Sequence, residues 1–363
     1  MKILVDIGHP AHVHLFKNFA KEMISNGHQV LFTCRDKEFE IALLKDNGFD
    51  YVSFGQKYKS LWGKIYGLVK FDLKEYSVAR RFRPDIFISH GSMYAAHAAW
   101  LLGKPHIAME DTYNFEQIKL YLPVSDVILT ADYENPLTQH HKNISYSGYH
   151  ELAYLHPKRF TPDKSVLKEL GLTEDEKFVL IRFVAWKATH DMGYSGLSLE
   201  NKIDVVKQLS QYSKVFISSE GELPKELEPY KITISPSKIH DVISFVSIVL
   251  GESTTMAEEA AMLATPAVLI GNNHIIYTKN LEEEYHLIFN LPNSDEGLKK
   301  GVEICIEILK QSKSRVDNEW IEKRDKMLRA KIDVTAFMVW FVENYPKSKK
   351  IMKENPDYQY RFK

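Results

Sequence analysis

The chain has 363 residues, enough for two domains, and its composition of 44% hydrophobic and 26% charged residues is that of a globular protein. The 47 basic and 48 acidic residues leave a net charge of −1, which argues against a dedicated nucleic-acid-binding protein, because such proteins usually carry a basic domain. The two cysteines, Cys34 and Cys305, lie in different predicted domains, which indicates reduced core residues and not a disulfide framework.

The first residues, Met1 to Asp6, lead directly into a predicted strand and lack the long apolar stretch of a signal peptide. No apolar run in the sequence approaches the length of a transmembrane helix. We therefore expect a cytoplasmic protein, with peripheral contact at the inner membrane face as an alternative.

An apolar run over residues 2–7 predicts the first buried strand, and residues 13–26 have the apolar spacing of a helix. Gly27 ends this helix, and residues 29–34 form the next strand. Strand, helix and strand in this order are a βαβ unit, which predicts a parallel sheet covered by helices. Ligands of such sheets bind beyond the carboxyl ends of the strands, so the loop from Gly8 to His12 lies at the functional edge.

Three histidines, His9, His12 and His14, lie in or next to this loop. Imidazole is a common metal ligand, but no acidic residue or cysteine is close in sequence, so we do not expect a metal site there. A histidine that faces a substrate phosphate or hydroxyl from the helix start is one interpretation. A purely structural histidine is the other, and both remain open.

Residues 56–83 combine an apolar helical face with a mainly basic polar face. The basic residues are Lys57, Lys59, Lys64, Lys70, Lys74, Arg80, Arg81 and Arg83. A basic amphipathic helix can lie on an anionic membrane surface. The alternative, a solvated helix that packs on the sheet, is favoured because every helix of a βαβ unit is amphipathic. A lipid-linked acceptor would favour the membrane interpretation.

Two acids, Glu110 and Asp111, follow the predicted strand over residues 106–109. Carboxylates at the carboxyl end of a strand suit general acid/base chemistry or the binding of sugar hydroxyls. The structural alternative is that Asp111 caps the next helix.

Prolines and polar residues around Pro157 and Pro162 indicate a linker between domains. We expect an N-terminal domain over residues 1–150, a linker over 151–164, a C-terminal domain over 165–330, and a C-terminal helix with a basic tail over 331–363. Long terminal helices are predicted over residues 296–311 and 318–344.

Two features of the second domain indicate ligand contact at a sheet edge. Arg182 is a charge on the otherwise apolar strand over residues 178–183, so it needs a partner. His190 and Asp191 follow in a loop after this strand, where contact with a ligand and a simple loop hydrogen bond are both open.

The second domain also contains a strand, turn and helix whose helix begins at Ser253, Thr254 and Thr255. Free backbone N–H groups and the positive end of the helix dipole make this position suitable for an anion. Two carboxylates, Glu258 and Glu259, lie about one turn further along. A nucleotide fits this pattern, with amides for its phosphates and a carboxylate for its ribose. An ordinary capped helix of a parallel sheet is the alternative.

Two Rossmann-like halves, this anion site and a long C-terminal helix resemble the GT-B superfamily. That superfamily includes MurG-type glycosyltransferases and the non-hydrolysing UDP-N-acetylglucosamine 2-epimerases. The whole chain is similar to the prokaryotic domain-of-unknown-function family 354, through Asp6 to His12, His190 with Asp191, and residues 251–261. The resemblance implies an α/β protein of GT-B fold, with two Rossmann-like domains, parallel sheets, and a C-terminal helix that packs back toward the N-domain.

The resemblance also implies binding roles. The nucleotide-sugar-binding residues it indicates are Gly8, Arg182, His190, Ser253, Thr254, Thr255 and Glu259. The helix start would hold the diphosphate. Glu259, seven residues before Pro266, would hold the ribose, as in many GT-B transferases. Arg182 would neutralise the leaving phosphate, and His190 corresponds to the phosphate-side histidine of the epimerases.

The acceptor would bind to the N-terminal domain. The loop from Gly8 to His12 is similar to the Gly/His loop of MurG-type transferases, and Glu110 lies where transferases and epimerases carry a glutamate. His12 or Glu110 would be the catalytic base that deprotonates the acceptor. No metal is required, because a helix dipole and a cation can stabilise the leaving group.

The function implied is a GT-B glycosyltransferase of surface polysaccharide or glycolipid assembly, without a cofactor. It would use a nucleotide sugar, with UDP-sugar favoured, and a saccharide or lipid-linked acceptor. An epimerase is the first alternative, although Ser92 follows Gly91 where epimerases carry an acid. A non-catalytic nucleotide-sugar-binding protein is the second.

Overall fold

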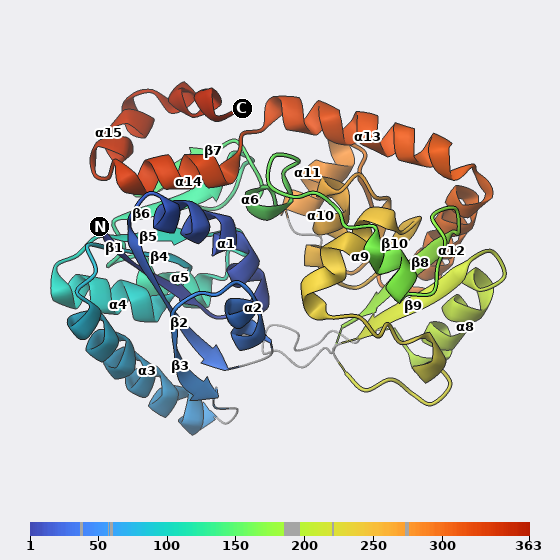
Figure 1. Ribbon diagram of the computed structural model, residues 1–363, viewed down its shortest axis with the longest axis horizontal. Helices are drawn as coiled ribbons and strands as arrows, with labels where there is room; N and C mark the ends of the chain where they lie inside the picture. The colour runs from blue at the N-terminus through green and yellow to red at the C-terminus, as the bar shows by residue number, and fades with distance from the viewer. Residues whose placement is uncertain (37–38, 57, 59–60, 185–196, 220, 273–275) are drawn as a thin grey trace. The chain divides into compact units, whose positions relative to one another are not determined.

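The computed structural model describes residues 1–363 except 37–38, 57, 59–60, 185–196, 220 and 273–275. The chain forms two compact units. The N-terminal unit comprises Met1–Arg159 together with Lys331–Lys363, and the C-terminal unit comprises Phe160–Ala330. Each unit has its own parallel sheet (Figure 1), as the βαβ pattern predicts.

In the described residues of the N-terminal unit, seven parallel strands form one sheet. Their spatial order is β3 (Tyr51–Gln56), β2 (Gln29–Asp36), β1 (Lys2–Ile7), β4 (Ile86–His90), β5 (His106–Met109), β6 (Val127–Ala131) and β7 (Asn143–Tyr146). The central strand β1 is almost wholly buried, because helices cover both faces of the sheet.

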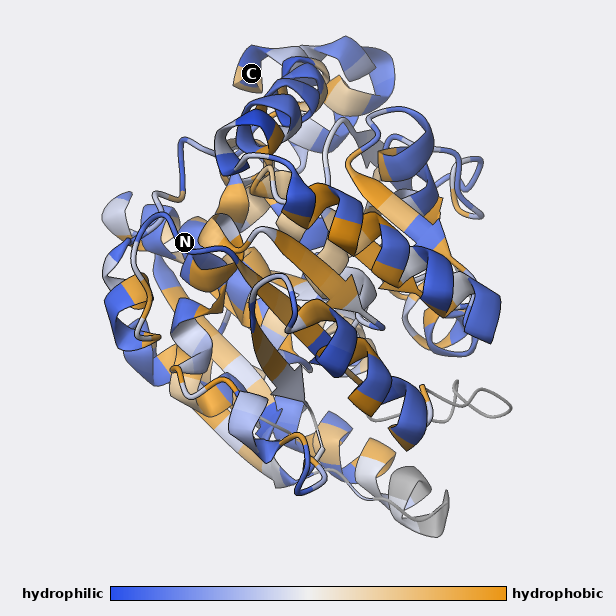
Figure 2. Ribbon diagram, turned by 90° about the vertical axis from the view of Figure 1, so that its right-hand side faces the viewer, coloured by the Kyte–Doolittle hydropathy of each residue, from blue (hydrophilic) through white to orange (hydrophobic). Residues whose placement is uncertain are grey.

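The helices of this unit alternate with the strands, as the sequence predicts. They are α1 (Pro10–Ser25), α2 (Glu40–Asp46), α3 (Leu61–Phe82), α4 (Met93–Leu102), α5 (Phe115–Tyr121), α6 (Leu152–Leu155), α14 (Val334–Glu343), α15 (Lys347–Glu354) and the 3₁₀-helix η4 (Pro356–Phe362). Figure 2 shows the hydrophobic strands flanked by helices with hydrophilic and hydrophobic residues in alternation. This is the pattern expected of amphipathic helices on a buried sheet.

The C-terminal helices belong to the N-terminal unit, which confirms that the chain packs back toward the N-domain. Helix α14 contacts α1 and α6. Thr335 Oγ1 and Asn18 Nδ2 donate hydrogen bonds to the same carbonyl, that of Ala153, at 2.7 and 2.9 Å.

The prediction of one helix over residues 318–344 is wrong. The chain forms α13 (Lys313–Ala330) and then α14, separated by a short turn. Asp333 caps α14 by accepting the Ala336 N–H at 3.0 Å, and the N–H of Ile332 bonds to the Ser147 carbonyl at 2.8 Å. These contacts end α13 because the backbone between the two helices bonds to partners outside a helix.

In the described residues of the C-terminal unit, five parallel strands form the second sheet. Their spatial order is β12 (Ile288–Leu291), β11 (Ala267–Ile270), β10 (Ile248–Gly251), β8 (Phe178–Phe183) and β9 (Lys214–Ser219). The α-helices are α7 (Ser165–Glu169), α8 (Leu199–Leu209), α9 (Ile239–Phe245), α10 (Thr254–Met262), α11 (Ile276–Glu283), α12 (Asp295–Lys310) and α13.

Candidate functional site

The parallel strands of the N-terminal unit bring several sequence-distant loops to one edge of the sheet. The loop after β1 carries His9 and His12, β4 ends at His90, and Asp111 follows β5. His150 follows β7. Since this edge is where ligands of parallel sheets bind, these side chains form the candidate site of the unit.

His12 lies at this edge, in the place that the sequence indicates. Its Nδ1 accepts the backbone N–H of Gly8 at 3.2 Å. A backbone N–H can only donate, so neutral His12 carries its proton on Nε2. The ring stacks on His90, with the centroids 4.3 Å apart. In this tautomer Nε2 can donate a hydrogen bond, whereas the sequence analysis proposes His12 or Glu110 as a base.

The neighbouring histidines have structural contacts. His9 caps α1 by accepting the Ala11 N–H on Nδ1 at 3.2 Å, and Pro10 occupies the first helical position, where its missing N–H costs nothing. His14 is buried and stacks on Tyr154. Of these three histidines, His12 is the one that stacks on His90.

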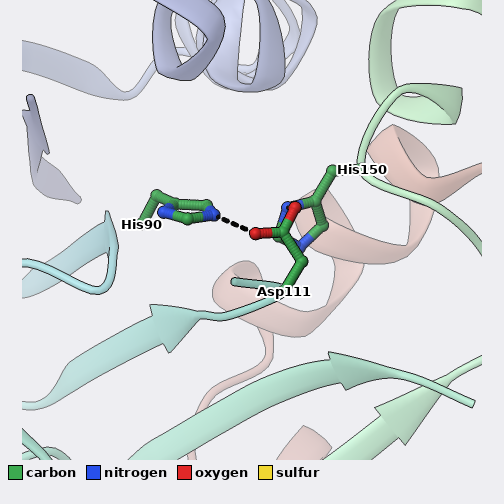
Figure 3. A group of neighbouring side chains, drawn as sticks. All are labelled: His90, Asp111 and His150. Carbon is green, nitrogen blue, oxygen red and sulfur yellow. Dashed lines mark hydrogen bonds and ion pairs between the residues drawn. The ribbon is translucent and has the colours of Figure 1, made fainter. Parts of the chain in front are cut away.

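His90, Asp111 and His150 form a close cluster that the sequence analysis did not identify (Figure 3). His90 Nε2 lies 2.9 Å from Asp111 Oδ1, and His150 Nδ1 lies 2.8 Å from Asp111 Oδ2. The side chains are 11%, 16% and 6% exposed, so the cluster is mostly dry and still reaches the surface. The nitrogen and carboxylate ligand atoms lie within 4.8 Å of one another, close enough to share a metal ion.

Charge stabilises this cluster. Burial by itself would lower the pKa of His90, but the charge and hydrogen bond of Asp111, with the charge of Glu110, raise it to about 9. Burial by itself would raise the pKa of Asp111, but His150 and His90 hold it well below its usual range. Asp111 is therefore an ionised carboxylate between two histidines.

Glu110 is predicted from the sequence to be the acid that faces the substrate, but its carboxylate accepts hydrogen bonds from its own turn. It is buried, and its Oε1 accepts the N–H groups of Thr112 and Tyr113 at 2.9 and 2.8 Å and the Thr112 hydroxyl at 2.8 Å. Its Oε2 accepts the hydroxyl of Tyr121. These bonds fix the turn that presents Asp111, and Tyr113 adopts a left-handed φ of 52° in it. Asp111 is the acid that meets the histidines.

Ser92 is committed to a structural role. It caps α4, and its hydroxyl donates a hydrogen bond to the buried carboxylate of Asp6. Asp6 also accepts from Arg35 Nη1 at 2.7 Å and from Thr33 Oγ1 at 2.9 Å. Position 92 therefore faces an existing carboxylate, and a second acid there would meet it at close range.

In the C-terminal unit, α10 begins as the sequence predicts. Ser253 is its N-cap, with Oγ accepting the Met256 N–H at 3.3 Å. Thr254 and Thr255 are the first helical residues and are half-buried. Their N–H groups have no partner within the helix, because the first turn has no preceding carbonyls. The start of α10 therefore has the features of an anion site.

Gly251 and Arg182 bring this helix start close to the neighbouring strand. A Cβ on Gly251 would lie 2.3 Å from the Arg182 carbonyl oxygen, so only glycine fits there. The N–H of Glu252 donates to the same carbonyl at 3.1 Å. The guanidinium of Arg182 donates from Nη1 to Ser218 Oγ at 2.8 Å. The Arg182 guanidinium therefore provides a positive charge at the edge of the sheet where α10 begins.

Glu259 is mostly buried and pairs with a histidine. Its Oε1 lies 2.9 Å from His240 Nε2, and the two side chains are 8% and 2% exposed. Glu258 is buried as well. His190 lies outside the described residues.

Glu252 is a further polar residue at this edge that sequence reasoning missed. Its two carboxylate oxygens accept the N–H groups of Val184 at 3.3 Å and Leu197 at 2.8 Å. The sequence signal that could have identified Glu252 was an acidic residue directly after Gly251, the glycine that ends β10.

Known structures with this architecture are similar along nearly the whole chain. S. aureus MnaA in complex with UDP has a TM-score of 0.63 and 12% identity, covering 88% of this chain and 90% of that one. UDP-GlcNAc 2-epimerase from Neisseria meningitidis, bound to UDP-GlcNAc, has a TM-score of 0.60 and 15% identity, covering 91% and 100%. MurG from Acinetobacter baumannii has a TM-score of 0.57 and 14% identity, covering 94% and 99%. The fold is therefore GT-B, as the resemblance implied.

The family described as "Protein of unknown function (DUF354)" matches residues 1–339. No curated protein matches the chain at a significant level. Among the described residues, no helix has the length and hydrophobicity to cross a membrane.

Proposed function

The chain belongs to the DUF354 family, whose match spans residues 1–339, and we propose that it is a glycosyltransferase that uses a nucleotide sugar. The observation that carries this proposal is the start of α10 in the second unit of a GT-B fold, with Gly251 packed against the backbone of Arg182. The N–H groups of Thr254 and Thr255 would bind the diphosphate, and the Arg182 guanidinium would balance its charge.

A UDP-sugar is the substrate we infer. Two of the similar structures contain UDP or UDP-GlcNAc, which supports a uridine nucleotide as the ligand of this chain. Glu259, oriented by His240, would accept the ribose hydroxyls.

The transfer step needs a group that accepts the proton of the acceptor hydroxyl as its oxygen bonds to the anomeric carbon and the nucleoside diphosphate leaves. We assign this task to the cluster of His90, Asp111 and His150, because Glu110 already accepts hydrogen bonds from Thr112, Tyr113 and Tyr121. A histidine of the cluster in its neutral form would take the proton, and the Asp111 carboxylate would stabilise the resulting imidazolium. His12, with its proton on Nε2, would donate a hydrogen bond to a substrate oxygen. Glu110 then acts by positioning Asp111.

Epimerisation is the alternative reaction, since one of the three similar structures described above is named a UDP-GlcNAc 2-epimerase. It requires removal and return of a proton at carbon, for which paired acids serve. Ser92 lies where the epimerases carry an acid, and its hydroxyl donates a hydrogen bond to Asp6, so an acid there would lie next to another carboxylate. This contact favours transfer over epimerisation.

The proposed acceptor is a saccharide. A lipid-linked saccharide would explain the exposed apolar surface of α3. Tyr66, Val69 and Leu73 lie on one helical face and are 60%, 56% and 65% exposed. Lys70 and Lys74 flank them and line the same shallow hollow. An apolar stripe between lysines matches an anionic lipid surface, so we infer peripheral contact of α3 with a membrane at the cytoplasmic face.

The experiment that tests the function is a thermal-shift screen of the full chain against UDP-, GDP-, CMP- and dTDP-sugars. A UDP-sugar should raise the melting temperature most. Mass spectrometry of the best ligand, with and without saccharide acceptors, then separates the reactions. Product that forms only with an acceptor supports transfer, epimer or glycal without an acceptor supports epimerisation, and stabilisation without any product supports a binding protein.

A further inference from the structure

His90, Asp111 and His150 come from the ends of three different strands of the N-terminal unit and converge on one point (Figure 3). Each offers one ligand atom, and these atoms lie within 4.8 Å of one another. The two imidazole–carboxylate separations are 2.9 and 2.8 Å. Ligand atoms at about 2.1 Å from a shared transition-metal ion lie roughly 3.0 to 3.4 Å from each other, so small side-chain adjustments would admit an ion.

We propose that His90, Asp111 and His150 bind one divalent transition-metal ion. Two imidazoles and one carboxylate are a donor set for Zn²⁺ and for Mn²⁺, Fe²⁺ or Co²⁺, whereas Mg²⁺ and Ca²⁺ prefer sites made of oxygen. Three protein ligands leave at least one coordination position for water or substrate, which is the pattern of catalytic metal sites.

The local charge favours a cation. Asp111 and Glu110 bring two adjacent carboxylates to the site, and the hydrogen-bond partners of Glu110 described above are neutral groups of Thr112, Tyr113 and Tyr121. A divalent ion would replace the proton that lies between His90 and Asp111 and would balance the charge of both carboxylates.

The ligands are also held by outer contacts, as metal ligands usually are. Glu110 fixes the turn that carries Asp111 through the N–H groups of Thr112 and Tyr113. The ring of His12 stacks on His90, and His150 packs edge-to-face on His90 with the centroids 5.2 Å apart. His12 itself is not a ligand, because its Nδ1 accepts the Gly8 N–H and the neutral ring carries its proton on Nε2.

With an ion bound, the three side chains would act as its ligands and not as the proton acceptor, and the ion would serve transfer by lowering the pKa of a bound acceptor hydroxyl so that it loses its proton to solvent. This consequence rests on the proposed function, whereas metal binding itself does not.

The test is direct metal binding to the full chain after chelation and dialysis. Titration with Co²⁺, followed by visible absorption, and with Zn²⁺, followed by calorimetry, should each show one equivalent bound. Asp111→Asn and His150→Ala should each weaken binding by at least about 10- to 100-fold. His97→Ala is the matched control, because His97 pairs with Asp72 at 3.0 Å outside this cluster, and it should bind metal like the unmodified protein.

Circular dichroism of each variant shows whether it folds, and Asp111→Asn keeps the shape of the side chain if His150→Ala does not fold. Absence of a stoichiometric site, or equal affinity in Asp111→Asn and the unmodified protein, would overturn the proposal. Both titrations omit nucleotide and acceptor, so a failed metal site leaves the nucleotide-binding test of the proposed function intact.

Discussion

Asp111 Oδ2 lies 2.8 Å from His150 Nδ1, although one residue follows β5 and the other follows β7. The adjacent acid, Glu110, points into the unit and accepts hydrogen bonds from Thr112, Tyr113 and Tyr121. Two successive carboxylates therefore have different tasks, one at the site and one that shapes the turn.

Asp111→Asn should lower transfer activity by about 100-fold or more while leaving the UDP-sugar thermal shift unchanged, because the proposed nucleotide site is the start of α10 in the other unit. Glu110→Gln should instead lower the melting temperature, since a neutral amide cannot accept all the bonds that the carboxylate accepts. The measurements are product formation by mass spectrometry and thermal unfolding. Full activity in Asp111→Asn would contradict the assignment of Asp111.

Much of this arrangement can be predicted from the sequence, because the patterns that predict strands, helices and helix caps are local. Apolar runs and glycine turns predicted alternating strands and helices, and the start of α10 at Ser253 was predicted from its capping residues. The direction in which a side chain points could not be predicted. Adjacent residues such as Glu110 and Asp111 point to different surroundings, and nothing in their spacing decides which one meets the ligand.

The cluster itself could not be predicted, because its three members come from distant segments that the sheet order brings together. Sheet order depends on long-range pairing, which local sequence patterns do not encode. The pairing of His240 with Glu259 was missed for the same reason. The helix break before α14 depends on Ile332 bonding to a distant strand end at Ser147.

Ser92→Asp tests the contact with Asp6. Aspartate is as good an N-cap as serine, so the helix cap is kept while a carboxylate is placed against a buried carboxylate. We expect Ser92→Asp to destabilise the protein more than Ser92→Ala, whose loss of a cap costs about 1 kcal/mol. Chemical denaturation compares the two variants.

If Ser92→Asp is as stable as the unmodified protein, position 92 can hold an acid. The structural objection to an epimerase would then be removed.

His106 should make stability depend on pH. Burial, and to a smaller extent the charge of His97, lower the pKa of His106 from 6.5 to about 3, and its nitrogens lie 2.9 and 2.8 Å from Ser89 Oγ and Ser125 Oγ. The unfolded chain therefore binds a proton between about pH 6.5 and 3 that the folded chain does not. The contribution of neutral His106 to the free energy of unfolding is fully present above pH 6.5. Below that pH the free energy of unfolding should fall by up to about 1.4 kcal/mol per pH unit.

The measurement is denaturant unfolding between pH 7 and pH 4.5, compared with His106→Gln, which keeps polar atoms without titrating. The difference between the two proteins isolates His106 from other groups. Parallel pH profiles would show that His106 is not the source.

The exposed face of α3 predicts binding to anionic lipid. The full chain should sediment with vesicles that contain phosphatidylglycerol and not with phosphatidylcholine vesicles, and salt should weaken binding because the lysines contribute. Val69→Ser with Leu73→Ser should reduce binding severalfold. The matched control is Trp100→Ser with Leu101→Ser on α4, which alters apolar residues that are 63% and 60% exposed outside the α3 stripe. Equal loss in both double variants would indicate nonspecific adsorption.

The central claim, that the start of α10 binds the nucleotide, is tested most directly by Thr254→Pro. Proline suits the first helical position, and Ser253 before it already has the extended backbone that proline requires, with φ −93° and ψ 112°. The substitution therefore removes one N–H group and leaves the fold intact, while Thr254→Ala keeps that N–H. Isothermal titration with UDP and the best UDP-sugar should show affinity reduced by about 10-fold in Thr254→Pro and nearly unchanged in Thr254→Ala. Equal affinity in a folded Thr254→Pro protein would contradict the account.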